Sequence, residues 1–461
     1  MDDAVAIVMP VGARTDLTRR AVESIRQHTS AGRYRLVFVA GPEGNVEGLE
    51  REGEVVLDDR PFNFARRVNL AIERTAKDAD VILINNDVVV EAGWFEAMRA
   101  RPYTLAVART QGGGCGNPDG WGRGAERPTD RGLNFFCVWL GRWVRRQIGP
   151  LDERFDAYGG EDIDYSLRAK RALIETIVSS AYVHHEKHGT FGKQCLGEPL
   201  QRGTKQFAEK WGFALSRPFG RNGWPRVSVV LANHNHGQWL EGAAESILAQ
   251  SYPLVELVIV DDGSTDESTQ AISRLKADER SAGRLKVYER AHAGGAAAKN
   301  FGMRECSGDV ITFQDADDIS DRERIERQLA ELRRTEGADF CYTNLRMVGP
   351  GGIPLGRFAT GPVDLERMLK LERYVAGATL MARRAAWEET SGFDESGELS
   401  RAYDFDFVLR AAKAGMRFKF LDEALYTYRR HGRNSCGTEE SIRQHLGRIR
   451  RFKRESARKS S

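Results

Sequence analysis

The sequence predicts an α/β fold in which one domain, with a doubly wound and mostly parallel sheet, occurs twice. The first observation is an internal repeat, because AVESI at residues 21–25 recurs as AAESI at residues 243–247. The second is that short β-branched runs alternate with helical segments in both halves. The third is length, since 461 residues suffice for several domains with well-buried cores.

The predicted strands of the two halves follow the same order. Each half opens with a run typical of a buried parallel strand, VAIVM in the first and VSVVL in the second. Second and third strands follow, with residues 36–39 corresponding to 257–260 and residues 81–84 to 310–313. Both third strands run into acidic or amide side chains. Ligands bind at the carboxyl ends of parallel strands, so we expect the functional residues there.

The repeat continues beyond these strands. GGEDIDYSLR at residues 159–168 parallels RAYDFDFVLR at residues 401–410, which aligns Asp162 with Asp404. His188 and His431 follow these aspartates at distances that differ by a single residue.

Proline and glycine cluster just before the first strand of the second copy and indicate a boundary near Asn222. The predicted organisation is a first domain over residues 1–222, a second over 223–435, and a basic C-terminal helix or tail over 436–461.

Composition excludes several classes of protein. The formal charge of +3, from 69 basic and 66 acidic residues, is too balanced for a nucleic-acid binder that works by bulk electrostatics. No apolar run approaches the roughly 18 residues of a membrane span. The N-terminus shows no secretory leader, and the six cysteines are scattered without a C-x-x-C pair. We therefore expect a cytoplasmic protein with reduced thiols.

Three carboxylates follow the third strand of the second copy: Asp315, Asp317 and Asp318. Carboxylates that crowd one crevice favour a bound cation, and hard oxygen ligands suit Mg²⁺ or Mn²⁺, which in turn hold a diphosphate. A solvated turn or a helix N-terminus is the alternative interpretation.

Two further segments of the second copy suit a nucleotide. Asp261 and Asp262 end the second strand, where an acid can accept hydrogen bonds from a base or a ribose, although an N-cap fits equally well. HAGGAAAKN at residues 292–300 then brings a glycine pair before Lys299 and Asn300, which favours close backbone approach to a nucleotide. It does not match the phosphate loop of ATPases.

Taken in order, VSVVLANHN, VELVIVDDGSTD, AAAKNFGM, ITFQDADD, SGFDE, YDFDFVLR and YTYRRHGRNS resemble a glycosyltransferase family 2 domain over residues 227–435. The first half resembles the same family in a rhamnosyltransferase-like form, through VAIVMPV, LINNDVVV, IGPLDERFDAYGGEDIDYSLR and FAEKWG. The resemblance implies two tandem GT-A (nucleotide-diphospho-sugar transferase, Rossmann-like) domains that act by inverting transfer.

The resemblance also implies roles for single residues. The general bases are Asp404 and Asp162, and a carboxylate suits that role because a sugar hydroxyl is a poor nucleophile. The metal contacts, to Mg²⁺ or Mn²⁺, are Asp317, Asp315 and His431 in the second copy and Asp87 and His188 in the first. The contacts to the nucleotide sugar are Asp261, Asp262, Lys299, Asn300 and Asp315 in the second copy and Asn85, Asn86 and Glu161 in the first.

Each copy departs from the family pattern. The first has Ala40 where the second has Asp261, so the acid that would hold the nucleoside is missing and its donor site is divergent. Its metal turn, residues 85–87, keeps a single carboxylate. The second copy has Tyr403 where the family pattern, and the first copy, have glutamate beside the base.

Three other features leave alternatives open. The cluster His184, His185, His188 and Cys195 resembles a zinc site but lacks a closing ligand at the usual spacing. Residues 112–124, rich in glycine, suit an acceptor loop or a plain surface loop. Apolar residues at helical spacing among basic ones near the C-terminus fit either peripheral contact with membrane lipid or packing on the domain; they are Ile442, Leu446, Ile449 and Phe452.

We therefore expect an inverting glycosyltransferase that moves sugar from a UDP-, dTDP- or GDP-sugar to a hydroxyl of a glycan or lipid-linked acceptor, in bacterial surface polysaccharide synthesis. Two working sites, or one active second domain with an acceptor-binding first domain, remain alternatives. A non-catalytic glycan-binding scaffold is disfavoured because binding alone needs no base at Asp404 or Asp162. A nucleotidylyltransferase would show a glycine-rich basic segment after the first strand, and neither copy offers a convincing one.

Overall fold

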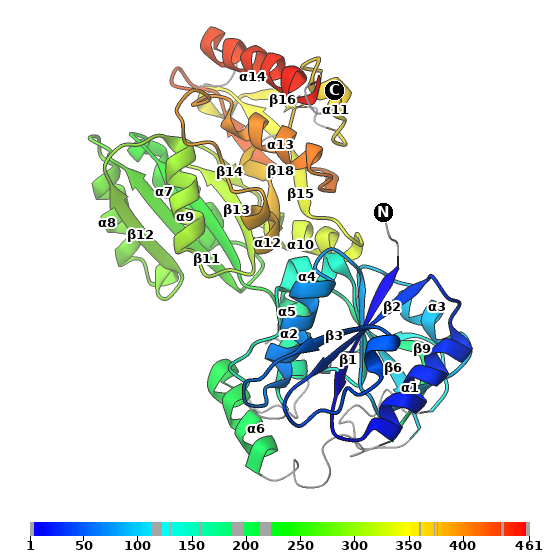
Figure 1. Ribbon diagram of the computed structural model, residues 1–461. Helices are drawn as coiled ribbons and strands as arrows, with labels where there is room; N and C mark the ends of the chain where they lie inside the picture. The colour runs from blue at the N-terminus through cyan, green and yellow to red at the C-terminus, as the bar shows by residue number, and fades with distance from the viewer. Residues whose placement is uncertain are drawn as a thin grey trace. The chain divides into compact units, whose positions relative to one another are not determined.

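The computed structural model describes residues 4–111, 122–129, 131–155, 159–186, 198–212, 223–358, 361–372, 374–375, 377–434 and 438–457. The chain divides into two compact units, Met1–Trp224 and Pro225–Ser461 (Figure 1). Each is an α/β unit with its own sheet and its own apolar core.

The elements of the first unit are β1 (Val5–Val11), α1 (Thr15–His28), β2 (Tyr34–Ala40), β3 (Glu54–Leu57), α2 (Phe64–Thr75), β4 (Val81–Ile84), β5 (Val88–Val90), α3 (Trp94–Arg99), β6 (Leu105–Thr110), β7 (Arg127–Pro128), β8 (Cys137–Leu140), α4 (Arg142–Ile148), α5 (Glu161–Arg171), β9 (Thr176–His185) and α6 (Glu198–Trp211).

The elements of the second unit are β10 (Val227–Asn233), α7 (Gly237–Leu248), β11 (Val255–Asp262), α8 (Ser268–Ala277), β12 (Leu285–Arg290), α9 (Gly295–Glu305), β13 (Val310–Asp315), β14 (Ile319–Ser320), α10 (Arg324–Arg334), β15 (Phe340–Val348), β16 (Pro354–Phe358), α11 (Leu365–Met368), β17 (Met381–Arg383), α12 (Arg384–Glu389), α13 (Tyr403–Lys413), β18 (Phe418–Arg429) and α14 (Glu439–Ala457).

The two sheets have the same strand order. Within the described residues the first runs β3-β2-β1-β4-β8-β6-β9-β5 and the second β12-β11-β10-β13-β17-β15-β18-β14. The first four strands of each are parallel, as expected, whereas β8 and β17 run antiparallel to their neighbours and make the sheets mixed. The central strands form because runs such as VAIVMPV are buried along their whole length, as suits a strand covered on both faces.

Strand register refines the internal repeat. With β1 laid over β10, Leu36 falls on Leu257, as the sequence predicts. The predicted match of the third strands is wrong by one residue, because Val81 falls on Ile311 rather than on Val310. Four apolar residues in a row give no internal mark of register, so only the ladder to the neighbouring strand fixes it. The corrected register lays residues 85 and 87 over residues 315 and 317.

A carboxylate in each unit joins the helix that carries the predicted base to the last helix of that unit. Asp406 in α13 forms ion pairs with Arg410 and with Arg448 of α14. Asp164 in α5 likewise pairs with Arg168 and with Lys210 of α6. The helix α14 thus packs on the second unit.

Candidate active site

The candidate site of the second unit lies where β10, β11 and β13 end. These parallel strands finish at Asn233, Asp262 and Asp315, and the register places residues 233, 261 and 315 at the same edge of the sheet. The amide of Asn233 donates to Asp261 Oδ1 over 2.7 Å and so joins two strand ends. Polar side chains therefore gather at the carboxyl edge, as the sequence predicts.

Asp317 meets two histidines. Its Oδ2 lies 2.9 Å from His431 Nε2 and 3.9 Å from His236 Nε2. One ligand atom from each of these three residues lies within 4.8 Å of the others, which makes the group able to hold a metal ion. Asp317 and His431 are predicted ligands; His236 is not. Its only signal in the sequence is its place directly after the first strand of the repeat, where loop residues reach the ligand edge.

The His431 ring is held from several sides. It stacks on Trp239 with centroids 4.0 Å apart. Its Nδ1 accepts a hydrogen bond from the backbone N–H of Arg433 over 3.1 Å. Its Nε2, the atom that faces Asp317, also lies 3.3 Å from the side-chain amide of Asn434. The side chain is thus oriented for Asp317 before any ligand binds.

Asp315 is paired with a buried lysine. Lys299 Nζ donates to Asp315 Oδ1 over 2.8 Å, with the lysine side chain 6% and the aspartate side chain 38% exposed. Burial alone would lower the pKa of Lys299, but the charges of Asp315 and Tyr403 and the hydrogen bonds to these two side chains together outweigh it and raise that pKa. Asp315 lies outside the three-residue group around Asp317. The structure therefore pairs this predicted metal or ribose ligand with a cation.

Asp318 points into the fold. It is fully buried, and its Oδ1 accepts the backbone N–H of Arg429 over 2.9 Å. Burial, together with the charges of Asp317 and Asp315, raises its pKa well above the usual range. Of the three acids at the end of β13 and just after it, Asp317 is the one that lies near both histidines.

The two acids at the end of β11 have internal partners. Asp261 accepts from Asn233 and from the Ser264 hydroxyl, the latter over 2.6 Å. Asp262 accepts the backbone N–H groups of Ala293 and Gly294, at 3.1 and 2.8 Å. The second acid thus holds the glycine loop that leads into α9, rather than facing outward.

The side chain of Asn300 also bonds to other parts of the second unit. Its Nδ2 donates to the Phe393 carbonyl and to Glu395 over 2.8 and 2.7 Å, and its Oδ1 accepts from the Phe393 N–H. The first unit repeats the arrangement, because Asn69 makes the same three contacts to Leu151 and Glu153. We therefore assign this predicted nucleotide contact a positioning role. The match also lays Val68 over Lys299.

Asp404 lies in the first turn of α13, with Oδ1 accepting the N–H of Phe405 over 2.8 Å. A Cβ at Gly377 would lie 2.6 Å from the Asp404 Cβ, so this backbone approach needs glycine. The neighbouring Tyr403 ring lies 5.4 Å from Lys299 Nζ. Burial raises the Tyr403 pKa. Tyr403 therefore connects the predicted base to the Lys299–Asp315 pair.

The first unit lacks this donor-side set. Register places Asn85 over Asp315 and Ala40 over Asp261. Asn86 is buried and donates to Thr18 Oγ1 over 2.9 Å, which turns it into the fold. Asp87 Oδ1 lies 3.3 Å from His185 Nε2. His188 is outside the described residues.

A buried arginine fills the edge of the first unit's sheet instead. Gly41 falls on the position of Asp262, and a Cβ there would lie 1.8 Å from the Arg67 guanidinium. Arg67 is 3% exposed and forms an ion pair with Glu43. The space that the second unit uses for an acid is thus occupied by a cation.

The first unit keeps its predicted base region. Glu161 and Asp162 begin α5 as Tyr403 and Asp404 begin α13. Burial, followed by the Asp162 charge, raises the pKa of Glu161 to about 8. Burial also raises the pKa of Asp162, although the Ile163 N–H opposes this.

The suggested zinc cluster is divided. His184 Nε2 lies 2.6 Å from Glu91 Oε1, whereas His185 pairs with Asp87. Cys195, most of the glycine-rich segment and His188 are outside the described residues.

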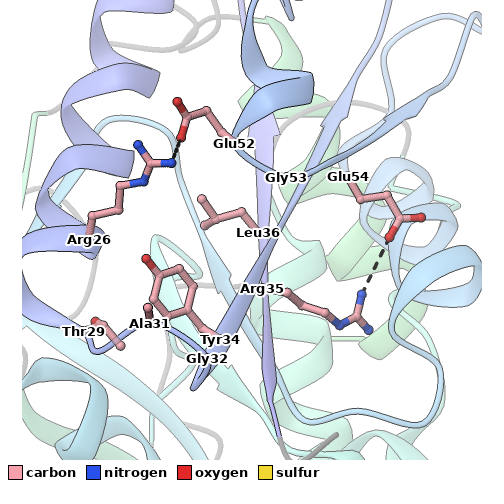
Figure 2. A pocket seen from close by; sticks show the side chains of 10 residues that line it. All are labelled: Arg26, Thr29, Ala31, Gly32, Tyr34, Arg35, Leu36, Glu52, Gly53 and Glu54. Carbon is pink, nitrogen blue, oxygen red and sulfur yellow. Dashed lines mark ion pairs between the residues drawn. The ribbon is translucent and has the colours of Figure 1, made fainter.

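A cavity of about 520 Å³ in this unit lies at the amino ends of β2 and β3, and the Arg26–Glu52 and Arg35–Glu54 ion pairs are among the side chains that line it (Figure 2). It is therefore at the opposite edge from Asp87.

The C-terminal helix α14 presents two kinds of apolar residue. Ile449 and Phe452 join the core of the second unit, whereas Ile442 and Leu446 are 50% and 41% exposed. Among the helices of the described residues, none is long and apolar enough to cross a bilayer.

Comparison with known proteins decides the family. Residues 228–354, from β10 to the start of β16, match the family model described as Glycosyl transferase family 2. EpsE of Bacillus subtilis, assigned as a glycosyltransferase, is 31% identical over 209 residues, which cover 45% of this chain and 74% of EpsE. The chain belongs to glycosyl transferase family 2. With the repeated sheet order, this membership confirms the expected α/β fold of two tandem GT-A domains.

Other relatives of this family 2 chain have named roles. TuaG of Bacillus subtilis, assigned as a teichuronic acid biosynthesis glycosyltransferase, is 30% identical over 207 residues, covering 44% of this chain and 79% of TuaG. A chondroitin synthase of Escherichia coli is 27% identical over 303 residues, covering 64% of this chain and 43% of that enzyme. The match thus spans less than half of that larger synthase.

Proposed function

We propose that the second unit transfers a sugar, with inversion, from a nucleotide-diphospho-sugar to a hydroxyl of a glycan or lipid-linked acceptor in surface polysaccharide synthesis. The observation that carries this proposal is the joint presence, at one sheet edge, of the Asp317–His431 pair and the Lys299–Asp315 pair. The names of EpsE, TuaG and chondroitin synthase support the polysaccharide context.

The residues at this edge fit a divalent cation. Asp317 and His431 would hold Mg²⁺ or Mn²⁺, with His236 near enough to join them. Such an ion, when bound, acts as a Lewis acid that offsets the charge of the departing diphosphate. A buried ammonium at Lys299 adds positive charge on the same side and stays protonated, because its pKa is raised.

Asp404 suits the general base. Its position in the first turn of α13 leaves the carboxylate partly exposed beside the Gly377 backbone, and one of its oxygens is engaged by the Phe405 N–H. A carboxylate so held can accept the proton of the attacking hydroxyl as the new glycosidic bond forms and the bond to the diphosphate breaks. Tyr403, next to Asp404 in the chain, places its ring 5.4 Å from Lys299 Nζ.

We propose that the first unit does not bind a nucleotide sugar and instead serves the acceptor. The first unit lacks the charged side chains that the second unit has at this edge. Its residues there are Ala40, Val68 and Asn85, in place of Asp261, Lys299 and Asp315. The buried Arg67 over Gly41 further fills the edge. A second working site is the alternative, favoured by the retained Glu161 and Asp162.

The helix α14 supports a peripheral contact with anionic lipid, which would suit a lipid-linked acceptor. Ile442 and Leu446 lie one turn apart and are exposed, and several exposed basic residues follow along the helix, the first of them paired with Glu440. These are Arg443, Arg450, Lys453 and Arg454.

The test is release of nucleoside diphosphate from UDP-, dTDP- and GDP-sugars, with candidate acceptors, with and without Mg²⁺ or Mn²⁺. We expect one donor to be turned over only with metal, and Asp404→Asn to lose about 10²-fold or more of the rate. Turnover that is unaffected by Asp404→Asn and by chelation would overturn the proposal.

A further inference from the structure

We propose that His236 is a third protein ligand to the metal, completing a site of two imidazoles and one carboxylate that binds first-row transition ions such as Mn²⁺ more tightly than Mg²⁺. This deepens the proposed function and rests on it, because it concerns the ion expected at the same sheet edge. Neither the family resemblance nor the order of acids after β13 points to His236.

Three separate segments bring the ligand atoms together. His236 follows β10, Asp317 follows β13, and His431 follows β18. Asp317 Oδ2 lies 2.9 Å from His431 Nε2 and 3.9 Å from His236 Nε2. The side chains of His431 and Asp317 are 13% and 14% exposed, and that of His236 is 27% exposed. The group is thus partly buried, with His236 the most accessible of the three side chains.

The packing favours this arrangement of the two rings. Trp239, in the first turn of α7, stacks on His431 at 4.0 Å and lies 5.6 Å from the His236 ring. Arg433 NH1 donates to the Asn235 carbonyl over 3.2 Å, which ties the turn after β18 to the loop that carries His236. Both imidazoles are therefore positioned by contacts that do not involve Asp317.

The donor set decides which ions fit. Mg²⁺ prefers oxygen ligands in near-ideal octahedral geometry and loses water reluctantly. Imidazole nitrogen suits first-row transition ions, whose affinity for such sites rises from Mn²⁺ through Co²⁺ to Ni²⁺. Two imidazoles with one carboxylate should therefore favour Mn²⁺ or Co²⁺ over Mg²⁺, whereas Asp317 and His431 alone would discriminate less.

The first unit provides an internal comparison. Counting from the end of the first strand, Arg14 stands where His236 stands in the second unit. Arg14 is exposed and forms an ion pair with Asp16. A guanidinium cannot ligate a metal ion, so a three-ligand site of this kind belongs to the second unit.

The experiment measures metal binding directly on the full chain, with Mn²⁺ as the probe. Free Mn²⁺ is followed by electron paramagnetic resonance, and pulsed measurements on bound Mn²⁺ detect coupling to ligating ¹⁴N. We expect His236→Gln to weaken Mn²⁺ binding about tenfold, to lower the preference for Mn²⁺ over Mg²⁺, and to reduce the ¹⁴N coupling. His184→Gln, which removes a partly exposed imidazole from the first unit, is the matched control and should change none of these.

The outcomes separate this inference from the proposed function. If Asp317→Asn and His431→Gln weaken Mn²⁺ binding while His236→Gln leaves affinity, selectivity and ¹⁴N coupling unchanged, His236 is not a ligand and the proposed function stands. If the wild type binds no Mn²⁺ with or without UDP, both the ligand assignment and the metal dependence of the proposed function are overturned. Thermal unfolding of each variant confirms that it is folded.

Discussion

In the second unit Lys299 donates to Asp315 over 2.8 Å, and the first unit lacks both partners, with Val68 and Asn85 in their places. A buried cation and its carboxylate have thus been lost or gained together between two copies of one fold. This joint change is what would be expected if the pair serves a ligand that only the second unit binds.

Substitutions of Lys299 and Asp315 should have coupled effects on the free energy of unfolding. Asp315→Asn leaves a buried ammonium without its charge partner. Because the Asp315 side chain is 38% exposed, we expect a loss of about 1–3 kcal/mol in the free energy of unfolding of the second unit, less than for a fully buried pair. Adding Lys299→Val, which copies the first unit, should recover part of this loss. Urea unfolding of the single and double variants measures the coupling, and additive effects of the two substitutions would contradict it.

Glu161 should make the stability of the first unit depend on pH. Its pKa is raised from 4.5 to about 8 by burial, so the folded state holds a proton that the unfolded state has released above pH 4.5. Stability therefore falls as the pH rises from about 4.5 to 8, by at most about 1.4 kcal/mol per pH unit. Glu161→Gln cannot ionise, so its Tm relative to wild type should be higher at pH 8 than at pH 5. The exposed Glu73→Gln is the control, and an equal shift in both variants would count against the assignment.

Asn300 and Asn69 form a matched pair for separating stability from turnover. Each Asn→Ala substitution removes three hydrogen bonds to a loop, so we expect a loss of about 1–3 kcal/mol in either unit. Asn300→Ala should also slow transfer, because the loop it holds packs through Phe393 on Tyr403, with ring centroids 5.2 Å apart. Steady-state kinetics with both variants test this. Equal effects on transfer would show that Asn300 has no special link to the site.

The outward side of α14 should bind anionic membranes. Leu446→Ser removes apolar area next to basic residues, and we expect it to weaken sedimentation with phosphatidylglycerol vesicles while neutral vesicles bind neither protein. Ile353→Ser, at an apolar residue just before β16 that is 64% exposed against 41% for Leu446, is the control. Binding that is unaffected by Leu446→Ser or by high salt would exclude this contact.

Sequence could predict the repeat, the α/β class and the carboxyl edge because strand patterning and internal similarity record them. It could not predict that Asp262 and Asn300 bond to loops of the fold. The sequence pattern around such an acid or amide is the same whether the side chain faces a ligand or a loop. Nor could it predict that His236 lies near Asp317 and His431, because these three residues come from segments far apart in the chain. The third-strand register was missed for a similar reason, as Val81–Ile84 is uniformly apolar.

The most direct test of the central claim, that the second unit is the catalytic one, compares Asp162→Asn with Asp404→Asn. Both substitutions remove a carboxylate from the first turn of an equivalent helix. The measurement is acceptor-dependent release of nucleoside diphosphate from each donor that the wild type uses. The account predicts that Asp404→Asn abolishes transfer from every such donor while Asp162→Asn leaves the chemical step intact. Loss of transfer from one donor by Asp162→Asn and from another by Asp404→Asn would contradict it and establish two working sites.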